Sequence, residues 1–191
     1  VIYNFRKNDL VNGGQGAPLT PIFHRLLKNK YKFKIPLLIV NIGGIANVTT
    51  INSDGHMQSN DIGPGNCLID KWIRMNSGMK YDEDGKVAKS GKINKTILNK
   101  ALKKYEHKNS LKSYDIKDFD ISFVKELSLE DGAATLTEYT SEILKNNLRM
   151  LCKDLEENII LSGGGRKNKL LVNSIEEKIN IQLKSIDEFG I

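Results

Sequence analysis

Short apolar runs separated by turn residues mark the chain between residues 36 and 64. Residues 36–42 are predicted as a buried strand and 46–52 as its neighbour, while Ser-Asp-Gly at 53–55 predicts a hairpin turn into a third strand. Apolar positions then recur at helical spacing, at Leu68, Ile69, Trp72, Ile73 and Met75. The pattern ends near Gly78. This order predicts three antiparallel strands followed by a helix.

The second half of the chain has a longer helical pattern and one short β-rich run. A long amphipathic helix is predicted over 131–155, with leucine and isoleucine positions that face a core. Residues 159–161 predict a strand, and a further helix is predicted from about Asn168. The last residues, 181–191, are predicted to form a strand that no following helix covers.

Two other parts of the chain have weaker patterns. Gly and Pro punctuate the stretch before residue 20 so densely that an ordered loop is predicted there, leading into a helix over 20–28. The middle, 81–127, is polar and rich in lysine, with short helical patterns at 95–104 and 123–127.

Composition narrows the class of protein. The chain has 191 residues, enough for one large domain or one and a fraction, and 39% are hydrophobic. No apolar run approaches the roughly 18 residues that a membrane helix needs, and no leader pattern opens the chain, so a cytoplasmic protein is expected. The two cysteines, Cys67 and Cys152, lie far apart without a CxxC pair, which predicts neither a disulfide framework nor a metal site.

The net charge of +6 raises the question of nucleic acid. The lysines are scattered and interleaved with acidic residues, and no aromatic-rich basic stripe accompanies them. A nucleic-acid partner is therefore not predicted. A basic balance also suits a phosphorylated or acidic small substrate.

Three glycine-rich turns each follow a predicted strand or open a predicted helix. They are Gly43-Gly44, Gly63-Pro64-Gly65, and the run of Gly163, Gly164 and Gly165. Glycine lets backbone N–H groups approach an anion closely, and a helix N-terminus adds unsatisfied donors. Each turn alone is weak evidence, since glycine turns are common, but together they predict a site that holds phosphate.

Two standard nucleotide motifs are absent. The stretch "GKVAKSGKI" at 85–93 resembles a Walker A loop, but five residues separate its glycines instead of four, and Ile93 replaces Ser/Thr. We interpret it as a surface loop. No GxGxxG follows a strand either, because Asn168 stands where the last glycine would be.

Asp61 precedes a glycine turn and is open to two interpretations. It is either a turn-forming or helix-capping carboxylate, or a base that accepts a proton beside the phosphate site. Asn66 has the better position to cap the helix that follows. Arg6, Asp9 and Gln15 lie in or near the first loop. They either form a local salt bridge and a solvated turn, or they contact a substrate.

A set of stretches in this chain resembles consecutive motifs of the anhydro-N-acetylmuramic acid kinases. They are "NDLVNGGQGAPLTPIFH", "LIVNIGGIANVT", "DIGPGNCLIDKWI", "DGAATLTEYT", "ILSGGGRKNKLL" and "DEFGI". The order and approximate spacing match over essentially the whole chain. Each motif is loose, but the set is specific.

The resemblance implies an α/β fold of the sugar kinase, heat-shock protein 70 and actin superfold. In that superfold two ribonuclease-H-like lobes, each a mixed sheet flanked by helices, hold the nucleotide between them. Residues 1–30 would be the end of the first lobe and the interlobe segment, and 31–191 would be the second lobe, incomplete at its C-terminus.

The resemblance also implies an activity. The family uses ATP and Mg²⁺ to phosphorylate the 6-oxygen of 1,6-anhydro-N-acetylmuramic acid while water opens the anhydro bridge, giving N-acetylmuramic acid 6-phosphate for peptidoglycan recycling. Asp61 matches the family's general base. Gly43 and Gly44 would lie at the phosphates, and Gly163, Gly164 and Gly165 near the adenosine. The residues expected at the substrate are Arg6, Asp9, Gln15 and Asn66.

The chain departs from the family pattern in several places. No Gly-Thr-Ser-x-Asp-Gly-x-Asp phosphate loop occurs, and the sequence ends at "DEFGI", where the family continues. The chain is thus expected to be the C-terminal part of a kinase and inactive alone, with a homodimer left open. The alternative is a non-catalytic nucleotide- or sugar-binding module without its partner lobe. Lys112, Ser113 and Phe119 match a Lys-Ser-Thr-Gly-Arg-Glu-like motif whose centre is replaced here.

Overall fold

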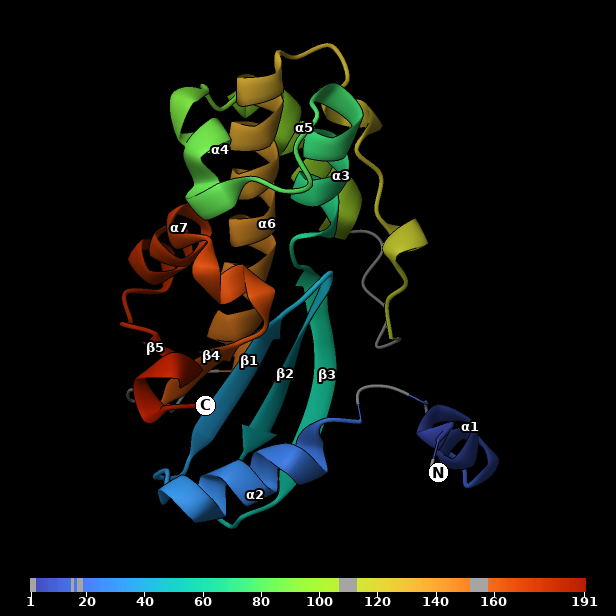
Figure 1. Cartoon of the computed structure of the whole chain (residues 1–191), viewed down its shortest axis with the longest axis vertical. Helices are drawn as coiled ribbons and strands as arrows, with labels where there is room; N and C mark the ends of the chain where they lie inside the picture. Colours follow the sequence, from blue (N-terminus) through green and yellow to red (C-terminus); the bar gives the residue numbers. More distant parts are fainter. Residues whose placement is uncertain (1–2, 15, 17–18, 107–112, 152–157) are drawn as a thin grey trace.

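The core of the protein is one mixed sheet of five strands in the order β3-β2-β1-β4-β5 (Figure 1). The computed structural model describes residues 3–14, 16, 19–106, 113–151 and 158–191. The strands are β1 (Leu37–Ile42), β2 (Ile45–Ile51), β3 (Met57–Pro64), β4 (Ile159–Ser162) and β5 (Lys184–Ser185). β2 pairs antiparallel with both β1 and β3, which confirms the predicted antiparallel unit. β4 pairs parallel with β1.

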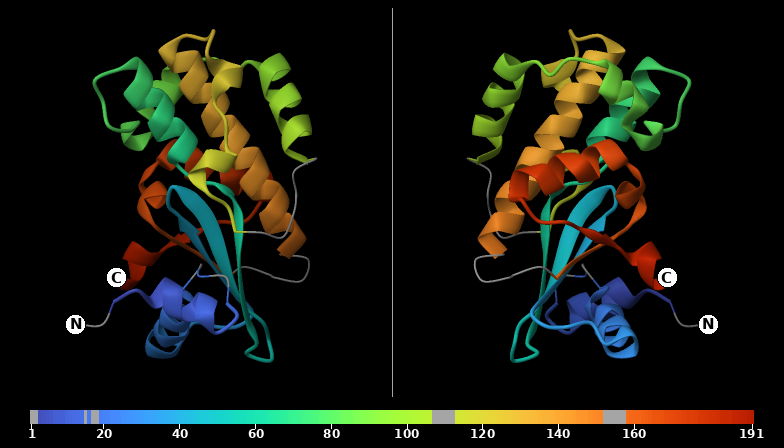
Figure 2. Two further views of the ribbon diagram at one scale, coloured as in Figure 1. Left: turned by 90° about the vertical axis from the view of Figure 1, so that its right-hand side faces the viewer. Right: turned by 90° about the vertical axis from the view of Figure 1, so that its left-hand side faces the viewer.

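The helices of the described residues are α1 (Phe5–Val11), α2 (Pro21–Tyr31), α3 (Cys67–Asn76), α4 (Lys86–Ser90), α5 (Lys95–Glu106), α6 (Leu129–Leu151) and α7 (Lys169–Ile179). Of these, α2, α6 and α7 pack on the faces of the sheet. Five short 3₁₀ helices join them, namely η1 (Glu83–Gly85), η2 (Ile116–Asp118), η3 (Ser122–Val124), η4 (Gly164–Lys167) and η5 (Ile186–Phe189). The two side views show α6 and α7 on one side of the strands and α2 on the other (Figure 2).

Strand β1 is apolar on both faces because it lies in the middle of this arrangement. Leu38, Val40 and Ile42 pack with α6 and α7, whereas Leu37 and Ile39 pack with α2. A central strand buried on both sides has a nearly continuous apolar sequence, and this explains the run that predicted it.

Helix α6 joins the sheet to a helical layer made of α3, α4 and α5. Gly132, near its start, lies against the indole of Trp72 on α3, where a Cβ would lie 2.4 Å from Trp72 Cε2. The Trp72 Nε1 donates to the carbonyl of Leu129 at 2.9 Å. Glycine therefore allows α3 and α6 to approach closely, and Trp72 is part of the core, as its helical spacing predicts.

The structure corrects several predicted elements. The expected loop before residue 20 contains α1, a local helix with no buried residue, so no apolar pattern predicts it. The expected surface loop at 85–93 contains α4, whose Ala88 is buried. The helix expected at 123–127 is only the 3₁₀ turn η3, and the expected final strand keeps two residues in β5.

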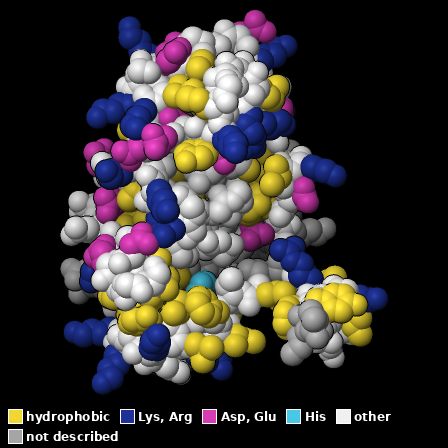
Figure 3. All heavy atoms as spheres, in the orientation of Figure 1, with side chains coloured by type: hydrophobic (Ala, Val, Ile, Leu, Met, Phe, Trp, Pro, Cys, Tyr) yellow, Lys and Arg dark blue, Asp and Glu magenta, His cyan; other side chains and the backbone are white. Residues whose placement is uncertain are grey.

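The face drawn in Figure 3 has lysine and arginine side chains interleaved with acidic ones. Exposed apolar side chains gather instead along α1 and α2, including Phe5, Ile22, Phe23 and Leu26. Within the part of the chain that the structure describes, no helix has the length and apolar character to cross a membrane. Cys67 is buried, whereas Cys152 lies outside the described residues.

Candidate active site

Four polar side chains form a row across the sheet, just before the strands reach the glycine turns. Ser162 pairs with Asn41, Asn41 with Asn47, and Asn47 with Asp61. Directly paired residues project their side chains from the same face of a sheet. All four are half-buried, and Asn41 and Asn47 each stand between two buried apolar residues of their strands. Of this row, only Asp61 has a role predicted from its sequence motif.

Asn41 and Asn47 carry carboxamides that make no hydrogen bond to a described residue. The Oδ1 of Asn47 is buried, and an unmet acceptor of this kind is costly and rare in native structures. A polar residue inside an apolar strand was the available signal for Asn41 and Asn47. Without the register, nothing in the sequence places them beside Asp61.

Asp61 lies beside a β-bulge, where the register of β3 against β2 shifts between Ala46 and Asn47. The backbone N–H of Tyr114 donates to its Oδ2 at 2.8 Å. Its Oδ1 has no hydrogen-bond partner among the described residues. Burial raises the pKa of this carboxyl, and the N–H of Tyr114 acts in the opposite direction. Asp61 thus has one oxygen held in place and one available to a water or hydroxyl.

The first two glycine turns are hydrogen-bonded to each other. The N–H of Gly65 donates to the carbonyl of Gly44 at 2.9 Å, and the N–H of Asn66 donates to that of Gly43 at 2.8 Å. A Cβ on Gly65 would lie 2.1 Å from the Gly43 oxygen. Only glycine allows this approach.

The third turn packs against the end of β1, just before the first turn, and against Asn66. Gly163 has a φ of +80°, and a Cβ there would lie 2.5 Å from Asn41 Oδ1. A Cβ on Gly165 would lie 2.3 Å from Ile42 Cγ2 and 3.0 Å from Asn66 Nδ2. The structure therefore brings all three predicted turns together at one end of the sheet.

A cavity of about 620 Å³ opens beside these turns. Asn66 and Gly164 line it, together with the segment 81–84 and the side chain of Asp70. Its volume is in the range of roughly 300–1,000 Å³ that small-molecule sites occupy. Lys167 and Lys169 also line it, so the wall carries cationic donors as well as carboxylate acceptors for a bound ligand.

The other predicted residues are placed differently. Arg6 is exposed on α1, and Figure 1 shows this helix apart from the glycine turns. The carboxylate of Asp9 accepts the N–H of Gly16 at 2.7 Å, which closes the loop after α1. Gln15 lies outside the described residues. The structure does not bring Arg6 or Asp9 to Asp61, because no element in the described residues carries α1 to that end of the sheet.

Asn66 holds the N-cap position of α3, as predicted, but its side chain makes no capping hydrogen bond. Its amide is therefore available at the edge of the cavity. His24 is buried under the sheet, where its Nδ1 lies 2.7 Å from Thr49 Oγ1 and burial lowers its pKa to about 4. His24 is thus a packed residue of α2.

The whole chain, residues 1–191, matches the family model described as anhydro-N-acetylmuramic acid kinase. This chain belongs to that family. It is 48% identical over 201 residues to the anhydro-N-acetylmuramic acid kinase of Pelagibacter ubique and 36% identical over 193 residues to that of Zymomonas mobilis. Both alignments cover 100% of this chain, but only 53% and 52% of the relatives. The chain spans about half the length of these curated relatives.

Solved structures support the fold. The activator of the 2-hydroxyisocaproyl-CoA dehydratase from Clostridium difficile matches with a TM-score of 0.52 and 14% identity, over 81% of this chain and 55% of that one. Xylulose kinase from Rhodospirillum rubrum matches with a TM-score of 0.51 and 7% identity, over 80% of this chain and 35% of that one. These likenesses confirm the predicted class, a mixed sheet flanked by helices as in actin-like ATPases and sugar kinases.

Proposed function

We propose that the full-length protein containing this chain uses ATP to phosphorylate 1,6-anhydro-N-acetylmuramic acid and opens its anhydro ring with water. The product is N-acetylmuramic acid 6-phosphate, which places the reaction in peptidoglycan recycling. The observation that carries the proposal is the match of all 191 residues to one kinase family. The half-bonded carboxylate of Asp61 beside three joined glycine turns supports it.

Asp61 is the proposed general base. Its Oδ1, which has no hydrogen-bond partner among the described residues, accepts a proton from the water whose oxygen bonds to C1 of the sugar, while the bond from C1 to O6 breaks. O6, which keeps the electron pair of that bond, then attacks the γ-phosphorus. The bond from the γ-phosphorus to the bridging oxygen breaks, and ADP leaves with its electron pair. Burial raises the pKa of Asp61, which makes it a stronger base than an exposed aspartate.

The joined turns are the proposed phosphate site. Gly43 and Gly44 contribute backbone groups at the phosphates, and Gly163, Gly164 and Gly165 lie on the adenosine side. We assign the adjoining cavity to the nucleotide and give Asn66 a contact with bound substrate. We keep Arg6, Asp9 and Gln15 as proposed substrate contacts, which requires their segment to move toward Asp61 in the complete site.

Mg²⁺ is part of the proposal as the usual partner of ATP phosphates. No group of three or more His, Cys, Asp or Glu side chains suited to a metal occurs among the residues with described placement. Mg²⁺ in phosphoryl-transfer sites keeps several waters and needs few carboxylates beside the phosphates. The described residues are therefore compatible with an Mg²⁺ ion that arrives bound to the phosphates of ATP. We assign no residue here as its ligand.

The test is turnover by the full-length protein with ATP, Mg²⁺ and 1,6-anhydro-N-acetylmuramic acid. Asp61→Asn should reduce formation of the 6-phosphate by about 100-fold or more and leave ATP binding largely intact. Asp54→Asn, in the exposed turn of the β2–β3 hairpin, is the matched control. Wild-type turnover that survives Asp61→Asn would disprove the assigned base.

A second candidate is a non-catalytic binding module, favoured by the fact that the chain spans about half of its relatives. Calorimetry of the 191-residue chain with ATP and with the sugar, beside the assay, separates the two. Binding without turnover by the full-length protein would support the module. We also propose that residues 1–30 belong to the end of a first lobe. The protein is proposed to work in the cytoplasm, where ATP is available. It is proposed to form a homodimer, and sedimentation of the full-length protein would test this.

A further inference from the structure

The hydroxyl of Tyr105 lies near two segments next to the proposed base Asp61, namely the segment of Tyr114 and strand β3. The hydroxyls of Tyr105 and Tyr114 share a hydrogen bond of 3.2 Å. Tyr114 is the residue whose backbone N–H donates to Asp61 Oδ2. The Tyr105 oxygen is also 3.5 Å from where a Cβ on Gly63 would lie, so it reaches the β3 backbone two residues after Asp61.

Tyr105 is itself held firmly. It is buried near the end of α5, its ring stacks on Phe119 at 6.4 Å between centroids, and it meets the edge of Tyr139 at 6.3 Å. Phe119 in turn packs against the Tyr114 ring at 5.2 Å. The rings of Phe119 and Tyr139 thus fix Tyr105 beside the segment that carries the N–H donor.

The segment from residue 114 to 121 packs its apolar side chains Tyr114, Phe119 and Ile121 in the core, and local hydrogen bonds shape its backbone. Its acidic side chains bind N–H groups within the segment or just beyond it: Asp115 accepts from Lys117, Asp118 from Asp115, and Asp120 from Ser122. These bonds shape the segment but do not tie it to the strand. The bond from Tyr114 N–H to Asp61 crosses from the segment to β3, and the Tyr105 hydroxyl bonds to the same Tyr114.

We propose that the Tyr105 hydroxyl is a positioning group, which holds the Tyr114 N–H on Asp61 and so keeps Asp61 Oδ1 free and directed toward the reacting water. This inference rests on the proposed role of Asp61 as base. Tyr105 does not touch substrate. It acts through Tyr114, and loss of its hydroxyl lets the N–H donor move away from the carboxylate.

Titration of Asp61 provides a readout that a purely structural role would not change. The N–H of Tyr114 favours the ionised carboxylate, so weakening this bond raises the pKa of Asp61. Burial raises the pKa of Tyr105 above its ordinary range, so the phenol stays neutral and contributes no charge change of its own. The acidic side chains of the 113–121 segment are present in every variant, so their effect on the pKa of Asp61 is the same in all of them.

The first experiment is carboxyl ¹³C NMR titration of the 191-residue chain, with Asp61→Asn to identify the Asp61 signal. Tyr105→Phe keeps the ring and should shift the Asp61 titration to higher pH. Tyr139→Phe is the matched control, because Tyr139 lies in the same ring cluster and its hydroxyl has no hydrogen bond to a described residue. This readout requires no turnover, so it separates this inference from the proposed function.

Tyr114→Phe removes the same hydrogen bond from the other side. It should give the same shift as Tyr105→Phe, and the double variant should add nothing further, since both remove one interaction. In the full-length protein, each single variant should lower kcat/KM about three- to tenfold and move its acidic limb to higher pH, with KM for ATP unchanged. A Tyr105→Phe titration that coincides with those of wild type and Tyr139→Phe would overturn the proposal, even if kcat/KM falls.

Discussion

Asn47 stands in strand register directly opposite Asp61, and its Oδ1 is buried without a hydrogen-bond partner among the described residues. Folding gains nothing from such an atom, because a buried acceptor that loses its water costs about 1–3 kcal/mol. The arrangement is typical of groups reserved for a ligand. Asn47 lies between the proposed base and Asn41, which touches the glycine turns.

Replacing Asn47 with Ala should therefore separate stability from activity. We expect the free energy of unfolding to stay the same or to rise by up to about 1 kcal/mol, because the unpaired amide is removed. Turnover by the full-length protein should fall at least about tenfold. Urea denaturation and steady-state kinetics measure the two effects. Asn60→Ala, on the other face of β3, is the control, and a destabilised Asn47→Ala with normal turnover would mean that the amide is structural.

Gly164 and Gly165 offer a matched pair in the third glycine turn. An added Cβ on Gly165 would meet the Ile42 side chain at 2.3 Å, whereas nothing lies within 4 Å of one on Gly164. Gly165→Ala should lower the free energy of unfolding by about 1–3 kcal/mol through overpacking. Gly164→Ala should leave it unchanged or raise it slightly. The urea midpoints of the two variants check this, and equal midpoints would contradict the close packing of the turns.

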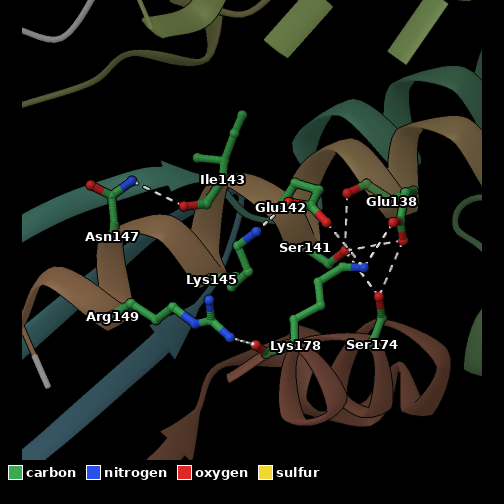
Figure 4. Close-up of polar contacts among 9 residues, drawn as sticks. All are labelled: Glu138, Ser141, Glu142, Ile143, Lys145, Asn147, Arg149, Ser174 and Lys178. Carbon is green, nitrogen blue, oxygen red and sulfur yellow. Dashed lines mark hydrogen bonds and ion pairs between the residues drawn. The ribbon is translucent and has the colours of Figure 1, made fainter. Parts of the chain in front are cut away.

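An ion-pair network joins α7 to α6 beside the sheet (Figure 4). Lys178 on α7 bonds to Glu138 at 2.7 Å and lies 3.2 Å from Glu142, while Lys145 pairs with Glu142 at 2.6 Å within α6. Burial acts to raise the pKa of Glu142, but its hydrogen bonds to Lys145 and Lys178 outweigh burial and hold this pKa below its ordinary value. These side chains are about 20% exposed, so the pairs are stronger than surface ones.

Lys178→Met keeps the apolar stem and removes the charge between the two helices. We expect a loss of about 1–3 kcal/mol in the free energy of unfolding, because two half-buried carboxylates lose their shared partner. Lys145→Met breaks a contact within one helix and should cost less. Thermal or urea unfolding of both variants at neutral pH is the measurement. A larger loss in Lys145→Met would show that the α6–α7 contact does not depend on Lys178.

His24 should make stability depend on pH. Its pKa is lowered from 6.5 to about 4 in the folded protein, so between these values the unfolded chain binds more protons than the folded one. The folded state consequently loses stability as pH falls from 6.5 to about 4. His24→Gln should flatten this part of the profile of unfolding free energy against pH. His56→Gln, at an exposed position, should leave the slope as in wild type.

The sequence by itself determined the elements whose signal is local. Apolar runs predicted β1 and β2 within a residue, and helical spacing predicted α3, because a buried face imposes a period on the chain. The third strand was predicted to follow the hairpin turn, where β3 lies. Glycine turns were visible for a related reason, since close backbone approach admits no side chain. The set of motifs identified the family, and the match over residues 1–191 confirms this.

The tertiary structure alone decided which polar residues meet. Asn41 and Asn47 join Asp61 through strand register, and Tyr114 reaches Asp61 across 53 positions of sequence, a contact that no local pattern encodes. Arg6 lies on the exposed helix α1, and its expected contact with the substrate stays a prediction. Local periodicity reflects burial of one face, whereas a site depends on distances between chain segments, and those are set only when the sheet and its helices pack together.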